Sequence, residues 1–218
     1  MTASTGESIG WVLGAYVAGT FPSTWLVARL RGGKAVRDHA DRRAGETDAH
    51  LLITKHLGAR WTALAATLDV AKGFVAVTLA RSPGHLSTSW LAVAGVAVVL
   101  GHSFPPYATR MAGRGMAGMA GVYLALLPVE MVAAGVIIVI GGVLRATGLA
   151  STVALAVVPV AAAVQGQPAS YVWMSVVILL LILARRLEGV RGVVRSGVPL
   201  GKAIASRAIF DATPTPER

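Results

Sequence analysis

Residues 116–144 read MAGMAGVYLALLPVEMVAAGVIIVIGGVL, and Glu130 is the only charged side chain among them. About 20 apolar residues are enough to cross a bilayer as a helix, so this stretch is too long for one untilted crossing. Pro128 removes a helix hydrogen bond near its middle. We therefore expect two membrane helices here, divided at Pro128, with Glu130 at the membrane interface.

The whole chain has the composition of a membrane protein. Its 218 residues are 55% hydrophobic and only 14% charged, with a mean hydropathy of +0.66. A soluble domain of this size carries about 25% charged residues. No Lys or Arg precedes the first apolar run, which is unlike a cleaved signal peptide, so we interpret that run as a retained helix.

Five further apolar runs complete the predicted fold, at residues 11–30, 61–80, 90–104, 149–164 and 170–184. We predict an all-α polytopic membrane protein with about seven transmembrane helices. Residues 31–60 are interpreted as a polar, basic loop. Residues 1–184 would form the membrane domain and residues 185–218 a basic cytoplasmic tail, whose Thr/Pro-rich end we expect to be disordered.

The Lys and Arg residues predict the orientation of the chain. All of them except Lys72 and Arg81 lie in or beside the 31–60 loop, in the 105–115 loop, at Arg145 or in the tail. Seven crossings place these four segments on one side of the membrane, whereas six crossings would divide them. The positive-inside rule then makes the N-terminus external, the tail cytoplasmic and the plasma membrane the expected location.

The net charge of +10 suits anionic lipid headgroups or phosphorylated substrates. We do not expect nucleic acid as a partner, because no aromatic residues alternate with the basic ones. The chain has no cysteine, and its five histidines form no pair at metal-ligand spacing. We therefore expect no metal and no cofactor.

Two groups of residues could carry chemistry. In GHSFP (residues 101–105), His102 could act as a general base, or it could be a packing histidine. In MAGRG (residues 111–115), small residues around Arg114 would let backbone N–H groups approach a phosphate, although an ordinary basic turn has the same composition. Asp69 and Lys72 share one helical face inside a span, as a functional pair or as a structural ion pair.

These motifs resemble those of a known family, the bacterial acyl-phosphate:glycerol-3-phosphate acyltransferases, almost from end to end. Residues 15–30, AYVAGTFPSTWLVARL, are similar to the family's first helix, AYxxGSxPxxxLVxRL, and Val36-Arg37 to the end of its DIR element. DVAKG (residues 69–73) matches DxxKG, and GHSFP matches GHxFP. MAGRG aligns with KGGKG, so Arg114 keeps one cation of that loop and Met111 loses the other.

The first cytoplasmic motif departs from the family pattern. The family has GSGNxGATN where this chain has ADRRAGETD (residues 40–48), which retains only Gly45 and Thr47. Asp41 and Asp48 replace a serine and an asparagine, and an ionised Asp cannot donate a hydrogen bond to phosphate. The arginine expected nearby falls on Leu51, and Lys55 is the candidate to replace it.

The resemblance implies transfer of an acyl chain from acyl-phosphate to glycerol 3-phosphate, or to a related polar acceptor, without metal, cofactor or covalent intermediate. His102 would assist proton transfer, although substrate phosphate could serve as its own base. The substrate-binding residues that the resemblance implies are Arg37, Gly45, Thr47, Asp48, Lys55, Asp69, Lys72, Gly101, Gly113, Arg114 and Gly115. The alternatives are a catalytically impaired relative that binds lipid or acts as a scaffold, and a transporter, which the absence of repeat symmetry disfavours.

Overall fold

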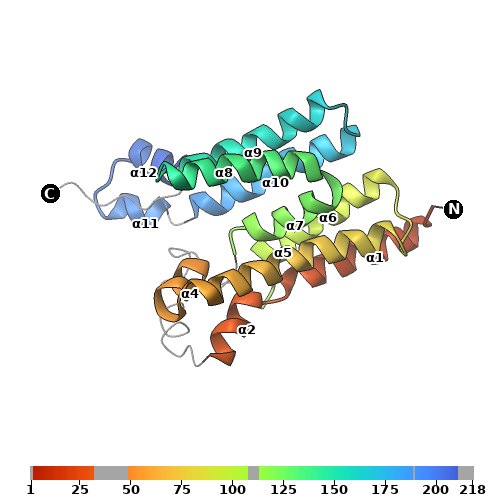
Figure 1. The fold of residues 1–218 in the computed structure, drawn as a ribbon, viewed down its shortest axis with the longest axis horizontal. Helices are drawn as coiled ribbons and strands as arrows, with labels where there is room; N and C mark the ends of the chain where they lie inside the picture. Colours follow the sequence, from red (N-terminus) through yellow and green to blue (C-terminus); the bar gives the residue numbers. More distant parts are fainter. Residues whose placement is uncertain (1, 32–48, 108–112, 189, 211–218) are drawn as a thin grey trace. The chain divides into compact units, whose positions relative to one another are not determined.

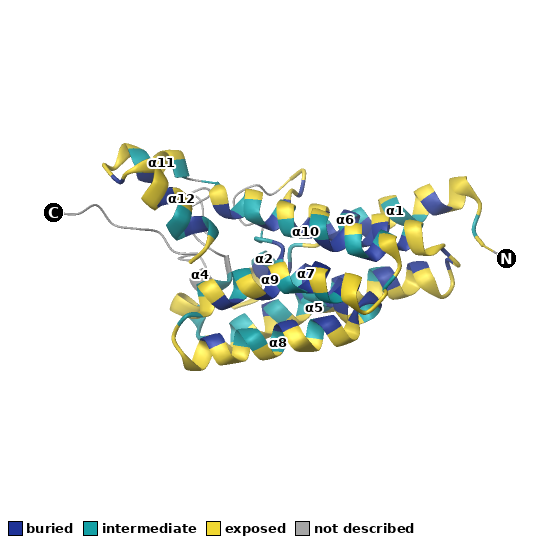
Figure 2. Cartoon of the chain, turned by 90° about the horizontal axis from the view of Figure 1, so that it is seen from above, coloured by how far each residue is buried: buried dark blue, intermediate teal, exposed yellow. Residues whose placement is uncertain are grey.

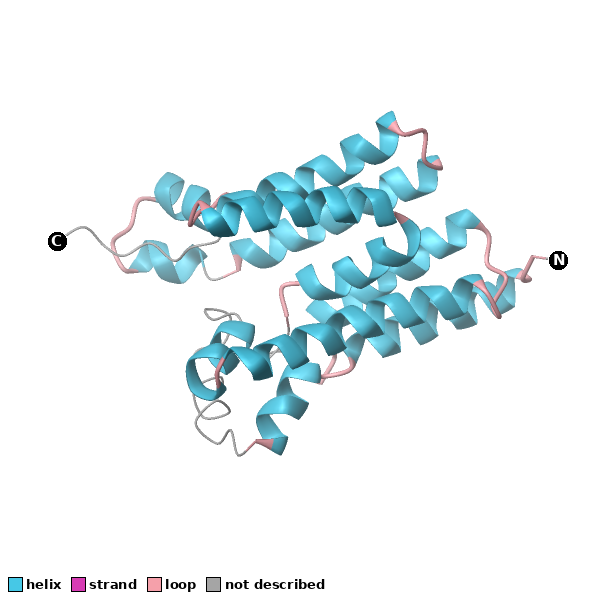
Figure 3. Ribbon diagram, in the orientation of Figure 1, coloured by secondary structure: helices cyan, strands magenta, loops and turns pink. Residues whose placement is uncertain are grey.

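The computed structural model describes residues 2–31, 49–107, 113–188 and 190–210, and all regular elements within these ranges are helices (Figures 1 and 3). The chain divides into two compact units, Met1–Leu127 and Pro128–Arg218. The first unit contains α1 (Thr5–Thr20), α2 (Ser23–Leu30), α4 (Ala49–Leu57), α5 (Ala59–Arg81), α6 (Thr88–Ser103) and α7 (Met116–Leu126). The second contains α8 (Pro128–Val143), α9 (Thr147–Val164), α10 (Ala169–Leu187), α11 (Val190–Arg195) and α12 (Leu200–Ala208).

Several of the described helices have the apolar composition of membrane helices, and three of them also have the length. Within the described residues α5, α9 and α10 are long and apolar enough to cross a bilayer, and α6, α7 and α8 are shorter apolar helices. Many large apolar residues are exposed, and Val143 of α8 is 79% exposed. Exposed residues recur along the helices of both units (Figure 2). In water such continuous apolar surface promotes aggregation, whereas in a bilayer it faces lipid.

Glycines set the close helix crossings of the first unit. On α1 and α6, a side chain at Gly19 or Gly101 would collide with a backbone carbonyl of the other helix. On α5 and α7, Gly73 and Gly121 are equally close to the opposing backbone. Small residues at such crossings let membrane helices approach and gain van der Waals contact, which replaces the hydrophobic driving force that lipid removes.

The first predicted span, residues 11–30, is wrong as a continuous helix. The structure divides it into α1 and α2 at Phe21–Pro22. Pro22 has no N–H to continue the hydrogen-bond ladder, and it disfavours helical geometry in the residue before it. The break turns backbone carbonyl groups away from the helix axis and makes them available to other elements.

The interpretation of residues 31–60 as a loop also needs correction, because α4 lies within it. Ile53 of α4 is fully buried against Val27 of α2 and Ala65 of α5. The guanidinium of Arg31 stacks over the Trp61 ring, 4.0 Å from its centroid. Residues 32–48, which carry most of the first motif, lie outside the described ranges.

In the second unit, the predicted division at Pro128 is confirmed, since α7 ends at Leu126 and α8 begins at Pro128. The interfacial position expected for Glu130 stays a prediction, but the residue does not face outward. Its side chain is buried, and Oε1 accepts a hydrogen bond of 2.9 Å from Nε2 of Gln167 in the turn before α10. This bond meets part of the cost of burying the carboxyl group.

The start of the predicted tail is helical and packs against the membrane helices of its own unit. Arg186, near the end of α10, is buried and donates hydrogen bonds to Ser151 and Thr152 of α9. Arg207 of α12 donates to the Arg186 carbonyl over 2.9 Å. The Thr/Pro-rich end lies outside the described residues.

Candidate active site

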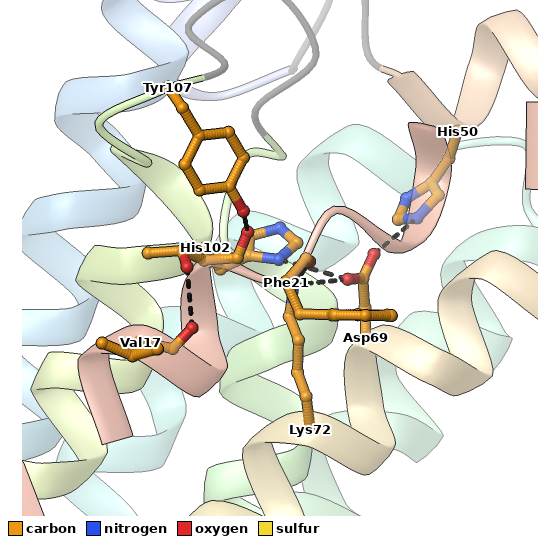
Figure 4. Close-up of polar contacts among 8 residues, drawn as sticks. Val17, Phe21, His50, Asp69, Lys72, His102 and Tyr107 are labelled. Atoms are coloured by element: carbon orange, nitrogen blue, oxygen red, sulfur yellow. Dashed lines mark hydrogen bonds and ion pairs between the residues drawn. The ribbon is translucent and has the colours of Figure 1, made fainter. Parts of the chain in front are cut away.

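Asp69 of α5 is the centre of a buried polar cluster (Figure 4). Its carboxylate is 1% exposed, and Oδ1 lies 2.7 Å from Lys72 Nζ and 3.4 Å from His102 Nδ1. Oδ2 lies 3.1 Å from His50 Nε2 of α4. The spacing of three residues places Asp69 and Lys72 on one helical face, as expected, so the buried carboxylate has a cation beside it.

The break between α1 and α2 provides acceptors for two side chains from other elements. Lys72 Nζ donates to the Phe21 carbonyl over 2.9 Å, and this oxygen also accepts the Ser23 N–H. Tyr107, which follows α6, donates its hydroxyl to the Thr20 carbonyl (Figure 4). A backbone irregularity inside a membrane protein needs such partners, because lipid offers none.

His102 lies in the last turn of α6, where its imidazole is held on two sides. Nδ1 faces Asp69, and the backbone of Gly113 lies against Nε2, so that a Cβ at Gly113 would occupy the same space as this nitrogen. A Cβ at Gly118 of α7 would lie 3.6 Å from the His102 Cβ, which is ordinary van der Waals contact. The ring is therefore fixed in position by a carboxylate and a glycine.

A small cavity of about 30 Å³ opens beside this cluster. It has room for water-sized groups. Two buried polar atoms beside it make no hydrogen bond within the described residues: Ser23 Oγ, and His102 Nδ1, whose one polar contact is the ion pair of 3.4 Å with Asp69 Oδ1. Buried polar atoms without a partner are uncommon, and they mark places where a water molecule or ligand is expected. The cavity is lined by Thr20, Phe21, Pro22, Ser23, Thr24, Trp25, Asp69, Lys72, His102, Pro105 and Gly113.

The segment 113–115 joins the cavity to α7. Its two glycines, Gly113 and Gly115, are each required for a different structural reason. Gly113 gives His102 its space, and Gly115 adopts a left-handed conformation, with φ of 94°, as the N-cap of α7. Gly115 has no side chain to cap the first turn of α7. The half-buried Arg114 lies between them. A cation beside a helix N-terminus whose N-cap is a glycine suits an anion.

The predicted site residues fall into three groups. Asp69, Lys72, His102 and Gly113 meet at the cavity, and Arg114 and Gly115 follow directly. Gly101 packs against α1, and Lys55 is exposed on α4 without a hydrogen bond or ion pair to the described cluster. The remaining four lie outside the described residues, namely Arg37, Gly45, Thr47 and Asp48.

His50 is the member of the cluster that sequence reasoning missed. It lies 19 positions before Asp69, in a stretch interpreted as loop, and it belongs to none of the recognised motifs. The break at Phe21–Pro22 was the other omission, although Pro22 within an apolar run was a signal for it.

Comparison with known proteins identifies the family. A family model described as glycerol-3-phosphate acyltransferase matches residues 9–195. The chain belongs to this family. The resemblance of the motifs is therefore confirmed, and the chain is an acyltransferase of phospholipid synthesis and a multi-pass protein of the plasma membrane.

Individual members of the glycerol-3-phosphate acyltransferase family are moderately similar to the chain. It is 36% identical over 125 residues to glycerol-3-phosphate acyltransferase 4 of Dehalococcoides mccartyi, a match covering 57% of this chain and 65% of that protein. It is 34% identical to the enzyme of Jannaschia sp., over 79% of this chain and 82% of the other.

A solved structure of the family has the same fold. The integral membrane glycerol 3-phosphate acyltransferase PlsY (YgiH), in its glycerol 3-phosphate form, superposes with a TM-score of 0.73 at 26% identity, covering 86% of this chain and 92% of PlsY. The same protein has been solved in a lysophosphatidic acid form, with a TM-score of 0.71.

Proposed function

We propose that this chain transfers an acyl group from an acyl-phosphate to glycerol 3-phosphate, forming lysophosphatidic acid and inorganic phosphate. The observation that carries the proposal is the buried cluster of Asp69, Lys72 and His102 beside a cavity with unpartnered polar atoms. The existence of PlsY structures in glycerol 3-phosphate and lysophosphatidic acid forms supports the acceptor and the product.

The phosphate group of the acceptor would bind at segment 113–115. Arg114 offers a guanidinium, and the first turn of α7 offers N–H groups that no Gly115 side chain caps. Gly113 brings this segment against His102, so a phosphate held here would place the acceptor's hydroxyl groups near the imidazole. The acyl chain of the donor would lie in the bilayer, against the apolar helix surfaces.

His102 would receive the proton in the transfer step. The hydroxyl oxygen of the acceptor attacks the acyl carbonyl carbon and forms the ester bond. The bond between that carbon and the phosphate oxygen then breaks, and the phosphate leaves with the electron pair. His102 takes the hydroxyl proton, while Asp69 orients the ring and His50 and Lys72 hold Asp69 in place. No covalent enzyme intermediate is needed.

The proposed enzyme crosses the membrane seven times, by α1, α5, α6, α7, α8, α9 and α10. The distribution of Lys and Arg supports an external N-terminus and a cytoplasmic C-terminus, with the Asp69 cluster opening toward the cytoplasm. We propose residues 1–184 as the membrane domain and residues 185–218 as its basic cytoplasmic extension.

Acyl transfer by the purified protein tests the function directly. Protein in detergent micelles receives palmitoyl phosphate and glycerol 3-phosphate, and lysophosphatidic acid and released phosphate are measured. We expect turnover by the wild type and a loss of about 10²- to 10⁴-fold for His102→Ala, the range typical of a general base. His50→Leu should lose activity to a smaller extent, because Lys72 still holds Asp69. Arg191→Gln, an exposed residue of α11, is the matched control.

Three results would each contradict a part of the proposal. A well-folded wild type that forms no lysophosphatidic acid would support the catalytically impaired relative instead. Turnover with acyl-coenzyme A but not with palmitoyl phosphate would refute acyl-phosphate as the donor. It would still support glycerol 3-phosphate as the acceptor. Full activity of His102→Ala would assign the proton transfer to the substrate phosphate.

A further inference from the structure

A second hollow lies in the first unit, away from the Asp69 cluster. It has a volume of about 220 Å³, and it is lined by Phe74, Val77, Thr78, Arg81, Leu124, Ala125 and Leu126. Arg81 is 9 residues beyond Lys72 on α5, which corresponds to about 14 Å along a helix axis. The hollow is therefore separate from the proposed catalytic cavity.

The packing of α5 on α7 explains why this space exists. The two backbones touch where Gly73 meets the Gly118 carbonyl and where Gly121 meets that of Val70. Larger residues line the hollow beyond these glycines, toward the C-terminal ends of both helices. Val77 is fully buried at the base of the hollow, whereas Phe74 and Leu124 are 42% and 40% exposed at its sides. The lining is apolar apart from Thr78 and Arg81.

Arg81 gives the hollow one charged end. Its Nη1 donates to the Ala125 carbonyl over 3.1 Å, which satisfies an acceptor in the last turn of α7. A guanidinium has five N–H donors, and this is the one hydrogen bond that Arg81 makes within the described residues. The side chain is exposed, so its other donors can reach a ligand.

We propose that this hollow binds an anionic phospholipid of the bilayer, with the lipid phosphate on Arg81 and one acyl chain between Phe74 and Leu124. An apolar trough that ends in a cation is complementary to such a lipid in both shape and charge. A volume of about 220 Å³ is several times the roughly 30 Å³ share of a water molecule. The mostly apolar lining of this space suits a segment of acyl chain rather than a compact polar metabolite.

Native mass spectrometry of the full chain in detergent micelles tests the site. Dioleoyl phosphatidylglycerol and dioleoyl phosphatidylcholine are titrated separately, because they share acyl chains and differ in net charge. We expect the wild type to retain the anionic lipid roughly five-fold more tightly, since a basic residue at a membrane surface contributes about 1 kcal/mol. Arg81→Gln keeps a donor for Ala125 and should lower this preference by about the same factor.

A second variant tests the apolar part of the site. Leu124→Trp fills the hollow without a change in charge, and it should weaken retention of both lipids. Arg195→Gln removes an exposed arginine of α11 and should change neither. An unchanged preference in Arg81→Gln would overturn the headgroup assignment, and this variant decides that point even if Leu124→Trp does not fold. Unchanged binding in a folded Leu124→Trp would overturn the hollow as the acyl site.

Discussion

The Asp69 carboxylate has partners from three helices: His50 of α4, Lys72 of α5 and His102 of α6. Because this carboxylate is buried, each partner offsets part of a desolvation cost that water would otherwise remove. Removal of one partner therefore changes the interaction of Asp69 with the other two. At the scale of residues, the site behaves as one connected group rather than as separate side chains.

Gly113→Ala should disable the site while leaving the fold intact. The added methyl group would occupy the position of His102 Nε2, so the ring must move. A displacement of about 1 Å at a reacting group can cost on the order of 100-fold in rate. We expect a loss of this size in kcat, with little change in thermal unfolding.

Gly135→Ala is the control for this change. No atom lies within 4 Å of a Cβ added at Gly135 of α8, so acyl transfer should stay at the wild-type level. Wild-type kcat in Gly113→Ala would show that the contact between Gly113 and His102 does not position the ring during turnover.

The sequence predicted most of this cluster, but not His50. The spacing of three residues indicated that Asp69 and Lys72 share a face, and the GHSFP and MAGRG motifs indicated His102 and Gly113. The contact of His50 with Asp69 depends on how α4 folds back onto α2 and α5, through buried Ile53. A tertiary contact of this kind leaves no periodic pattern in one sequence.

At the scale of elements, three prolines show why a breaking residue alone does not predict a break. Pro128 begins α8 and Pro22 separates α1 from α2, yet Pro159 lies inside α9 without ending it. The break at Pro22 is stabilised by donors from Lys72 and Tyr107, which reach the Phe21 and Thr20 carbonyls. The position of such donors is set by the fold, so local sequence could not distinguish the three cases.

Pro22→Ala should convert this break toward a continuous helix. The restored backbone N–H would favour helical hydrogen bonds across residues 21–25 and withdraw the Phe21 carbonyl from Lys72. A hydrogen bond to a charged group contributes about 1.5–3 kcal/mol, so we expect acyl transfer to fall roughly ten-fold or more. Thermal unfolding should occur at the same or a higher temperature.

Pro83→Ala, in the exposed turn after α5, controls for the loss of a proline in general and should leave the rate unchanged. Hydrogen exchange at residues 21–25 reports the helix itself. If Pro22→Ala exchanges these amide hydrogens more slowly but keeps full acyl-transfer activity, the break is not needed for catalysis. This result would contradict the role given to the Phe21 carbonyl.

At the scale of the whole molecule, the distribution of basic residues predicts the number of crossings, and the cysteine-free chain allows a clean test. Single cysteines at Ser82, Gln165 and Ser196 are exposed reporters for three connections. With seven crossings, a membrane-impermeant maleimide should label Ser82→Cys and Gln165→Cys on intact cells. Ser196→Cys should react only after permeabilisation.

A six-crossing chain, with α7 and α8 as one span, gives a different pattern. Ser82→Cys would still be labelled on intact cells. Gln165→Cys would then react only after permeabilisation, and Ser196→Cys would be labelled on intact cells. The Ser82 reporter is therefore the internal control for orientation, and the other two decide the count.

The bend at Phe21–Pro22 also has a consequence in time. Its Lys72 and Tyr107 donors are 51 and 87 residues further along the chain than the carbonyl groups that they satisfy. At about 5–20 residues per second, a ribosome needs on the order of ten seconds to supply the second one. The carbonyl groups of the bend therefore remain without these donors until Lys72 and Tyr107 have been synthesised, and the cavity beside His102 is completed only after α6.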